Sequence, residues 1–144
     1  MPEPVRPAAS RDEERQLAGL LAARISTGMV QLMSRFTGRG PTKARTSVNT
    51  NLVVVVFEQT LTKGELNLVR AGQGEGVASQ RRTFQRLMRE DAVALIERLT
   101  TRKVVSVLGD TDPESDIATM VFVLEREPET GVIETAEAHS GEPQ

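Results

Sequence analysis

The chain has 144 residues, enough for one domain, and 38% of them are hydrophobic while only 3% are aromatic. Its net charge of −2 gives the whole molecule no general attraction for nucleic acid. The absence of cysteine excludes disulfides and thiolate chemistry. The single histidine, His139, lies in an acidic stretch outside the expected fold, so a histidine triad or a histidine-based zinc site within the fold is excluded.

The longest apolar run has six residues, whereas about 20 are needed to cross a bilayer. We therefore expect no signal peptide and no transmembrane segment. The expected location is cytoplasmic, with any membrane association peripheral and made through a partner or a surface patch. Residues 1–9 carry three prolines, and residues 127–144 are acidic with few large apolar groups. Such segments bury too little to offset their ordering entropy, so we predict two disordered tails around a single domain at residues 10–126.

The first element predicted is a long helix from Arg11 to Phe36. Ser10 and Glu13 fit a capping box at its start, and the glycines and proline of residues 38–41 end it. Apolar residues recur at helical spacing within it: Leu17, Leu21, Ile25, Met29, Leu32 and Phe36.

Two strands follow the helix. Residues 42–49 alternate apolar and polar side chains, which predicts a half-exposed strand, and residues 49–51 form a tight turn. The next run, Leu52 to Phe57, is wholly apolar and contains four valines. It predicts a strand that needs protein on both faces, or a second layer docked there. The two strands should form an antiparallel hairpin.

Helices return after this hairpin. Thr62 and Glu65 fit a second capping box that opens a short helix through Val69, and residues 72–76, rich in glycine, should break it. A long helix is predicted over residues 77–99. Strands at residues 103–108 and 117–125 follow, joined by a turn-rich loop at residues 109–116.

The predicted fold class is therefore α+β, in the order α-β-β-(α)-α-β-β. Two antiparallel β-hairpins build one four-stranded sheet, and the helices pack on one face. The sequence leaves the strand order open. The helical crossover could make the second and third strands parallel neighbours.

Three patterns resemble sites, and each has a simpler structural interpretation. The glycines of residues 38–40 and 72–76 do not stand between a strand and a helix, so they indicate helix breaks better than phosphate loops. Asp110, Asp112, Glu114 and Asp116 have the oxygen ligands of a calcium loop but not its central glycine or terminal glutamate, which favours a solvated turn. Glu58 ends the most apolar strand, where a carboxylate that reaches solvent or pairs with Arg45 is favoured over a catalytic one.

Basic side chains gather in two regions and form the candidate site. We expect six of these residues to bind an anion or a partner: Arg39, Lys43, Arg45, Arg82, Arg86 and Arg89. Arg35 and Arg81 lie close to them in the sequence. If the two regions meet, they could bind a phosphate backbone. The scarcity of aromatic residues removes the stacking platforms of single-strand binders, which favours a solvated helix face.

Several of these features together resemble the small MpsC-like proteins, of which the YbcI type is one. They are the first helix with Gly38-Arg39-Gly40-Pro41, the hairpin, Leu61-Thr62 with Glu65, the Arg81-Arg82 helix, and Val121-Phe122-Val123-Leu124. The resemblance spans residues 17–125. It implies an accessory role beside a membrane ion-translocating subunit and a large soluble partner, in a sodium-translocating or inorganic-carbon uptake system. It implies no catalytic residue, cofactor or metal.

Three hypotheses follow. The first is a non-enzymatic accessory domain that binds a protein partner, and we also expect a homodimer because four short strands leave two sheet edges. The alternative is a module that binds nucleic acid or a phosphate ligand through the arginine-rich face. The third is an enzyme, which would need Glu58, Asp110 or Asp116 to converge in one cleft.

Overall fold

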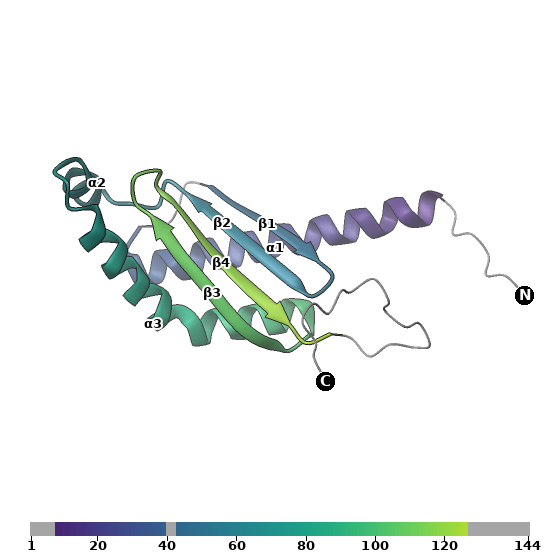
Figure 1. The fold of residues 1–144 in the computed structure, drawn as a ribbon. Coiled ribbons are helices and arrows are strands. Elements are labelled where there is room, and N and C mark those ends of the chain that lie inside the picture. The colour runs from purple at the N-terminus through teal and green to yellow at the C-terminus, as the bar shows by residue number, and fades with distance from the viewer. Residues whose placement is uncertain (1–7, 40–42, 127–144) are drawn as a thin grey trace, which may run out of the picture.

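The computed structural model describes residues 8–39 and 43–126. Its helices and strands form one helical layer on a single sheet (Figure 1). The elements are α1 (Ala8–Thr37), β1 (Lys43–Asn49), β2 (Leu52–Glu58), α2 (Lys63–Arg70), α3 (Gly74–Thr100), β3 (Val104–Asp112) and β4 (Ile117–Leu124). The predicted α+β class and the two β-hairpins are confirmed. The predicted tails at residues 1–9 and 127–144 lie almost wholly outside the described residues.

The sheet has the order β1-β2-β4-β3, and every neighbouring pair is antiparallel. The central strand β2 pairs with β4, so that Val53 lies opposite Phe122 and Phe57 lies opposite Ala118. The parallel pairing of the second and third strands that the sequence left open does not occur. The crossover through α2 and α3 carries the chain to the far edge, and β4 then fills the place between β2 and β3.

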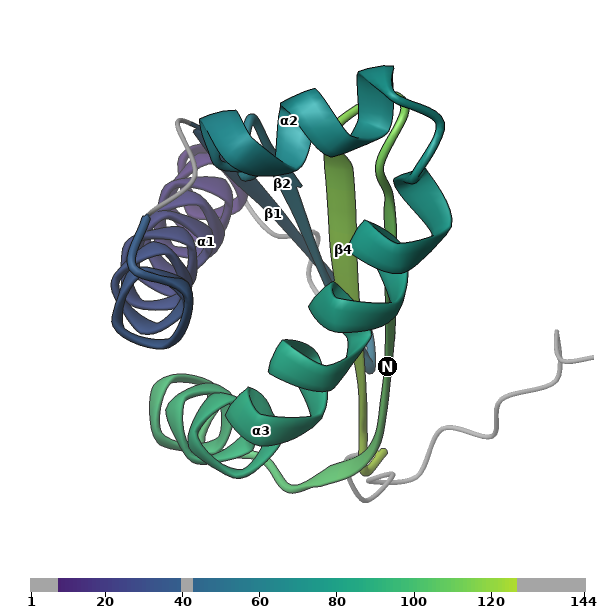
Figure 2. The same cartoon turned by 90° about the vertical axis from the view of Figure 1, so that its left-hand side faces the viewer.

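Both long helices lie on the same side of this sheet, as predicted (Figures 1 and 2). Helix α1 packs along β1, α3 packs along β3, and the two helices contact each other. Val53, Val55 and Phe57 of β2 are fully buried beneath them, whereas Val54 and Val56 on the other face are only half-buried. No described helix or strand covers that second face, so the expectation of protein on both faces of β2 is not met within residues 8–39 and 43–126.

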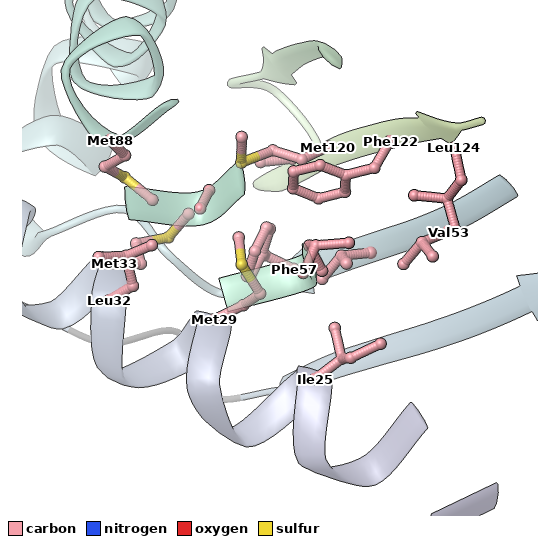
Figure 3. Packing of buried hydrophobic residues seen from close by; sticks show 14 residues of the cluster. Ile25, Met29, Leu32, Met33, Val53, Phe57, Met88, Met120, Phe122 and Leu124 are labelled. Atoms are coloured by element: carbon pink, nitrogen blue, oxygen red, sulfur yellow. The ribbon is translucent and has the colours of Figure 1, made fainter. Parts of the chain in front are cut away.

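The core is built from aliphatic and sulfur-containing side chains, with Phe57 and Phe122 at its centre (Figure 3). Flexible methionines fill the irregular space between the helices and the sheet, where a chain with few aromatic residues has no large rings to place. They are Met29, Met33, Met88 and Met120.

Helix α1 begins earlier than predicted. It starts at Ala8, so Ser10 lies inside the helix and the predicted capping box of Ser10 with Glu13 is wrong. Residues 11–20 are exposed throughout and form an arm that extends past the β1–β2 turn (Figure 1). The predicted end of α1 is confirmed. Gly38 adopts a φ of +81°, and the Gly38 N–H donates to the Ser34 carbonyl at 2.9 Å.

Helix α1 also has the length and composition of a membrane-crossing helix over Ser10–Thr37, and no other described helix does. This indicates a membrane span only weakly, because core helices of soluble proteins share those properties. Ile25, Met29 and Leu32 of α1 are buried against the sheet.

The second capping box is confirmed. The Thr62 hydroxyl accepts from the Glu65 N–H at 3.1 Å, and the Glu65 carboxylate accepts from the Thr62 N–H at 2.8 Å. The glycine-rich break is shorter than predicted, because α3 already begins at Gly74. A Cβ at Gly74 would lie 2.5 Å from the Glu114 carboxylate, so this glycine permits packing against the β3–β4 turn.

The first half of the loop predicted at residues 109–116 is strand. Strand β3 continues to Asp112, and the turn is confined to residues 113–116. Asp110 pairs with Thr119 and Asp112 with Ile117 across the ladder. Cross-strand pairing therefore overrides the turn preference of the aspartates.

Candidate anion-binding cleft

Three of the predicted arginines line one cleft. Arg82, Arg86 and Arg89 stand at i, i+4 and i+7 on α3, so they share a face of the helix. That face meets β3 along residues 107–109, and the cleft between them measures about 230 Å³. Gln85 and Met120 complete the lining. We call this site the arginine cleft.

The position of α3 beside β3 depends on two residues that the sequence did not single out. Gln85 is buried, and its amide nitrogen lies 3.5 Å from the carbonyl oxygens of Asp110 and Thr119. A Cβ at Gly109 would lie 2.7 Å from the Thr119 carbonyl and 3.0 Å from the Gln85 side-chain oxygen. A glycine inside a strand pattern is the signal that could have pointed to this close approach.

The three arginines differ in how far their charge is offset. Arg82 forms ion pairs with Asp110 at 3.2 Å and with Glu75 at 3.6 Å. Arg86 donates to the uncharged Thr83 hydroxyl at 3.2 Å. Within the described part of the chain, neither Arg86 nor Arg89 forms an ion pair. Two exposed guanidinium groups therefore remain able to bind an anion bidentately.

The other predicted cations lie elsewhere. Lys43 and Arg45 are on β1, and strands β2 and β4 separate them from the arginine cleft at β3. Arg39 follows the end of α1, where its N–H faces the Thr37 hydroxyl at 3.4 Å. Lys43 and Arg45 therefore do not share a surface with the arginine cleft. Arg45 lies 3.2 Å from the Glu58 carboxylate, which confirms that pairing.

Arg81 is adjacent to this group in sequence but has a structural role. Only 4% of it is exposed, and it forms two hydrogen bonds with the Glu65 carboxylate and one with the Thr60 carbonyl at 2.9 Å. Burial of Glu65 raises its pKa, but the hydrogen bonds from Arg81 and Thr62 and the charge of Arg81 outweigh this, so the pKa falls below its ordinary value of 4.5. The ion pair of Arg81 with Glu65 thus connects α3 to α2.

Three of the four carboxylates proposed as metal ligands, among them two of the proposed catalytic groups, have separate partners. Asp110 pairs with Arg82, and Asp112 accepts from the Ser115 hydroxyl at 3.0 Å. Asp116 accepts from the backbone N–H groups of Thr60 and Leu61 at 2.9 and 3.1 Å. Over residues 8–39 and 43–126 there is no group of three or more histidine, cysteine or acidic residues that could hold a metal ion.

A larger hollow, of about 430 Å³, lies between α1 and α3. Arg35 and Arg98 line it, but so does the carboxylate of Asp91. The arginine cleft has no acidic residue in its lining, which makes it the better candidate for an anionic ligand.

The fold and the cleft together define a two-layer α+β domain with one helical face and a cationic seam at the edge of its sheet. The chain belongs to the MpsC family, whose description is "Na+-translocating membrane potential-generating system (MpsC)" and which it matches over residues 18–126. This confirms the resemblance drawn from the sequence. No curated protein and no solved structure shows a significant match to the chain.

Proposed function

We propose that this chain is a non-enzymatic accessory component of a Na+-translocating, membrane potential-generating system. In this proposal it binds an acidic segment of a protein partner in that system through the arginine cleft. The observation that carries the proposal is the pair Arg86 and Arg89, whose charges no carboxylate of the described chain offsets. Membership of the MpsC family supports the part of the proposal that concerns a Na+-translocating, membrane potential-generating system.

The cleft suits a short acidic segment. Arg86 and Arg89 are three residues apart on α3, so their Cβ atoms lie roughly 5–6 Å from each other, close enough for both to bind one carboxylate or two neighbouring ones. Val107 and Met120 give the cleft an apolar part that can cover the aliphatic portion of a bound side chain. Arg82, which pairs with Asp110, also lines the cleft.

The experiment is a crosslinked pull-down of the tagged full-length protein from its own cells, with membrane, soluble and nuclease-treated fractions separated. We expect integral membrane proteins in the captured material, with or without nuclease. Arg86→Glu combined with Arg89→Glu should abolish their recovery, because both guanidinium groups are replaced by carboxylates that repel an acidic segment.

The matched control is Lys63→Glu combined with Lys103→Glu. It changes the net charge equally but alters exposed cations outside the cleft lining, so recovery should persist. Equal loss in both double variants would show that only overall charge matters. Capture of no membrane protein at all would contradict the proposal.

A second candidate function, binding of nucleic acid or another phosphate ligand, draws on the same two arginines. It predicts partners that disappear after nuclease, and an affinity for RNA that falls with salt. For double-stranded ligands the logarithmic slope would be about −0.9 for each phosphate contacted. Undetectable binding of RNA and DNA at low salt would exclude the nucleic-acid form of this function.

A further inference from the structure

The face of the sheet opposite the helices is apolar over half its length. By strand alternation it carries the side chains of Leu52, Val54 and Val56 from β2 and of Val121 and Val123 from β4. Leu108 on β3 is 61% exposed, and Val105, at the β-bulge of β3, is 59% exposed. Soluble proteins rarely leave so continuous an apolar patch in water, so we expect another protein surface to cover it.

Residues that lie opposite one another on the four strands form rows across this face of the sheet, and the charged residues are confined to some of these rows. One row runs Lys43, Glu58, Ile117, Asp112, and the next runs Arg45, Val56, Thr119, Asp110. Each row therefore begins with a cation on β1 and ends with a carboxylate on β3. The two rows nearer the β1–β2 turn contain no charged residue: Ser47, Val54, Val121, Leu108, and Asn49, Leu52, Val123, Ser106.

If a second copy of the chain packs against this face, the charges of the two copies are complementary for only one orientation of the two-fold axis. A two-fold axis parallel to the strands keeps each row at its own level but reverses the strand order, so β1 of one copy faces β3 of the other. Lys43 then faces Asp112 and Arg45 faces Asp110, while the uncharged rows face each other. A two-fold axis perpendicular to the strands would instead place charged rows over aliphatic ones.

We propose that two copies of this chain pack sheet against sheet through this face, about an axis parallel to the strands. Packed sheets lie about 10 Å apart and are rotated by roughly 30°, so the rows meet in an approximate register. Such an isologous contact needs a self-complementary surface, which the β1 cations and β3 carboxylates provide. Arg45 and Asp110 already pair with Glu58 and Arg82, which leaves Lys43 and Asp112 as the principal pair.

The arrangement also leaves the arginine cleft free. The cleft opens between α3 and β3, and of its lining residues only Leu108 also lies on the face proposed as the contact. A dimer would thus present two arginine clefts. The sheet face measures roughly 400 Å² for strands spaced about 4.8 Å apart, a small interface. We therefore expect micromolar dimerisation.

The test is sedimentation equilibrium of the full chain from about 1 to about 100 µM, a range chosen for a small interface. We expect a reversible dimer. Leu52→Glu, on the uncharged rows, should raise the dimer dissociation constant by about a hundredfold by burying a carboxylate without a partner. Leu68→Glu, on the exposed surface of α2, is the matched control and should leave the constant unchanged.

The charges test the symmetry itself. Lys43→Glu or Asp112→Lys alone should each raise the dissociation constant about tenfold, because each loses two symmetry-related pairs. The double variant should restore it to within about threefold, since the pair is then reversed. A monomer at the highest concentration, or a dimer that Leu52→Glu does not weaken, would overturn the proposal. Failure of the double variant to restore the dimer would overturn the strand-parallel axis.

Discussion

At the scale of single residues, the junction of β2, α2 and α3 depends on two carboxylates. Asp116 binds the backbone N–H groups of Thr60 and Leu61, and Glu65 binds both Arg81 and the start of α2. Glu65 thus caps a helix and neutralises a buried guanidinium with one side chain. Its low pKa follows from these contacts.

Replacement of Arg81 by methionine should lower the free energy of unfolding by about 3 kcal/mol, because it leaves the Glu65 carboxylate without its ion-pair partner. The same contact predicts a pH dependence. Since the folded pKa of Glu65 lies below its ordinary value of 4.5, the pair stabilises the fold above that pH and its contribution is lost as the pH falls through the folded value.

Urea denaturation between about pH 3 and pH 6 measures this dependence. In Glu65→Gln, the loss of stability on acidification should be smaller than in the unmodified chain. Glu90→Gln, at an exposed position of α3, should leave the profile unchanged. Identical profiles for all three proteins would contradict the assignment.

A strained backbone position gives a second prediction at this scale. Thr101 follows the end of α3 with φ 57° and ψ 28°, a left-handed conformation that a β-branched residue adopts at a cost. Thr101→Gly should raise the free energy of unfolding by about 1 kcal/mol. Thermal or urea unfolding would show it, and Ser79→Gly inside α3 should instead lower stability by about 0.5 kcal/mol.

At the scale of elements, the arginine cleft exists because α3 and β3 approach closely at Gly109. Gln85 bridges the helix to the carbonyls of β3 and β4, and no Cβ fits between them. The width of the cleft is therefore determined by the contact of the Gln85 side chain with the backbone of β3 and β4, and the three arginines line the cleft beside it.

Gly109→Ala should lower the free energy of unfolding by about 2 kcal/mol, because the added methyl group meets backbone that cannot move away cheaply. It should also widen the cleft and weaken partner binding. Gly76→Ala is the matched control. A Cβ at Gly76 meets nothing within 4 Å and the residue is helical, so this change should raise stability by about 0.5 kcal/mol. Equal effects at both positions would refute the close approach.

At the scale of the whole molecule, the family description concerns a membrane system, while the only described helix apolar enough to cross a membrane, α1, supplies part of the core. Helix α1 cannot enter a bilayer without removing Ile25, Met29 and Leu32 from the sheet. Association with a membrane should therefore depend on the cationic surface.

We expect membranes washed with about 1 M salt to release the protein. At that salt concentration the Debye screening length is about 3 Å, so electrostatic attraction between exposed charges is largely lost. The Arg86→Glu and Arg89→Glu double variant should already be soluble at low salt. Fractionation followed by immunoblotting measures both. Retention of the protein through a high-salt wash would favour insertion of α1.

Features that depend on residues close together in the chain followed from the sequence alone. The apolar run of β2, the capping box of Thr62 with Glu65 and the end of α1 at Gly38 each depend on a few neighbouring positions, and each was predicted correctly. The extent of β3 was predicted wrongly, because cross-strand pairing overrides local preferences there. The start of α1 was also predicted wrongly, and packing does not explain it, since residues 11–20 are exposed.

Other features were decided by the tertiary structure. Arg81 and Arg82 are neighbours in sequence, yet one is buried against Glu65 and the other lines a cleft, since consecutive residues on a helix point in different directions. The place of β4 between β2 and β3 put Lys43 and Arg45 at the far edge from the arginine cleft. Nothing local to either segment encodes that separation, because strand order depends on contacts between residues far apart in the chain.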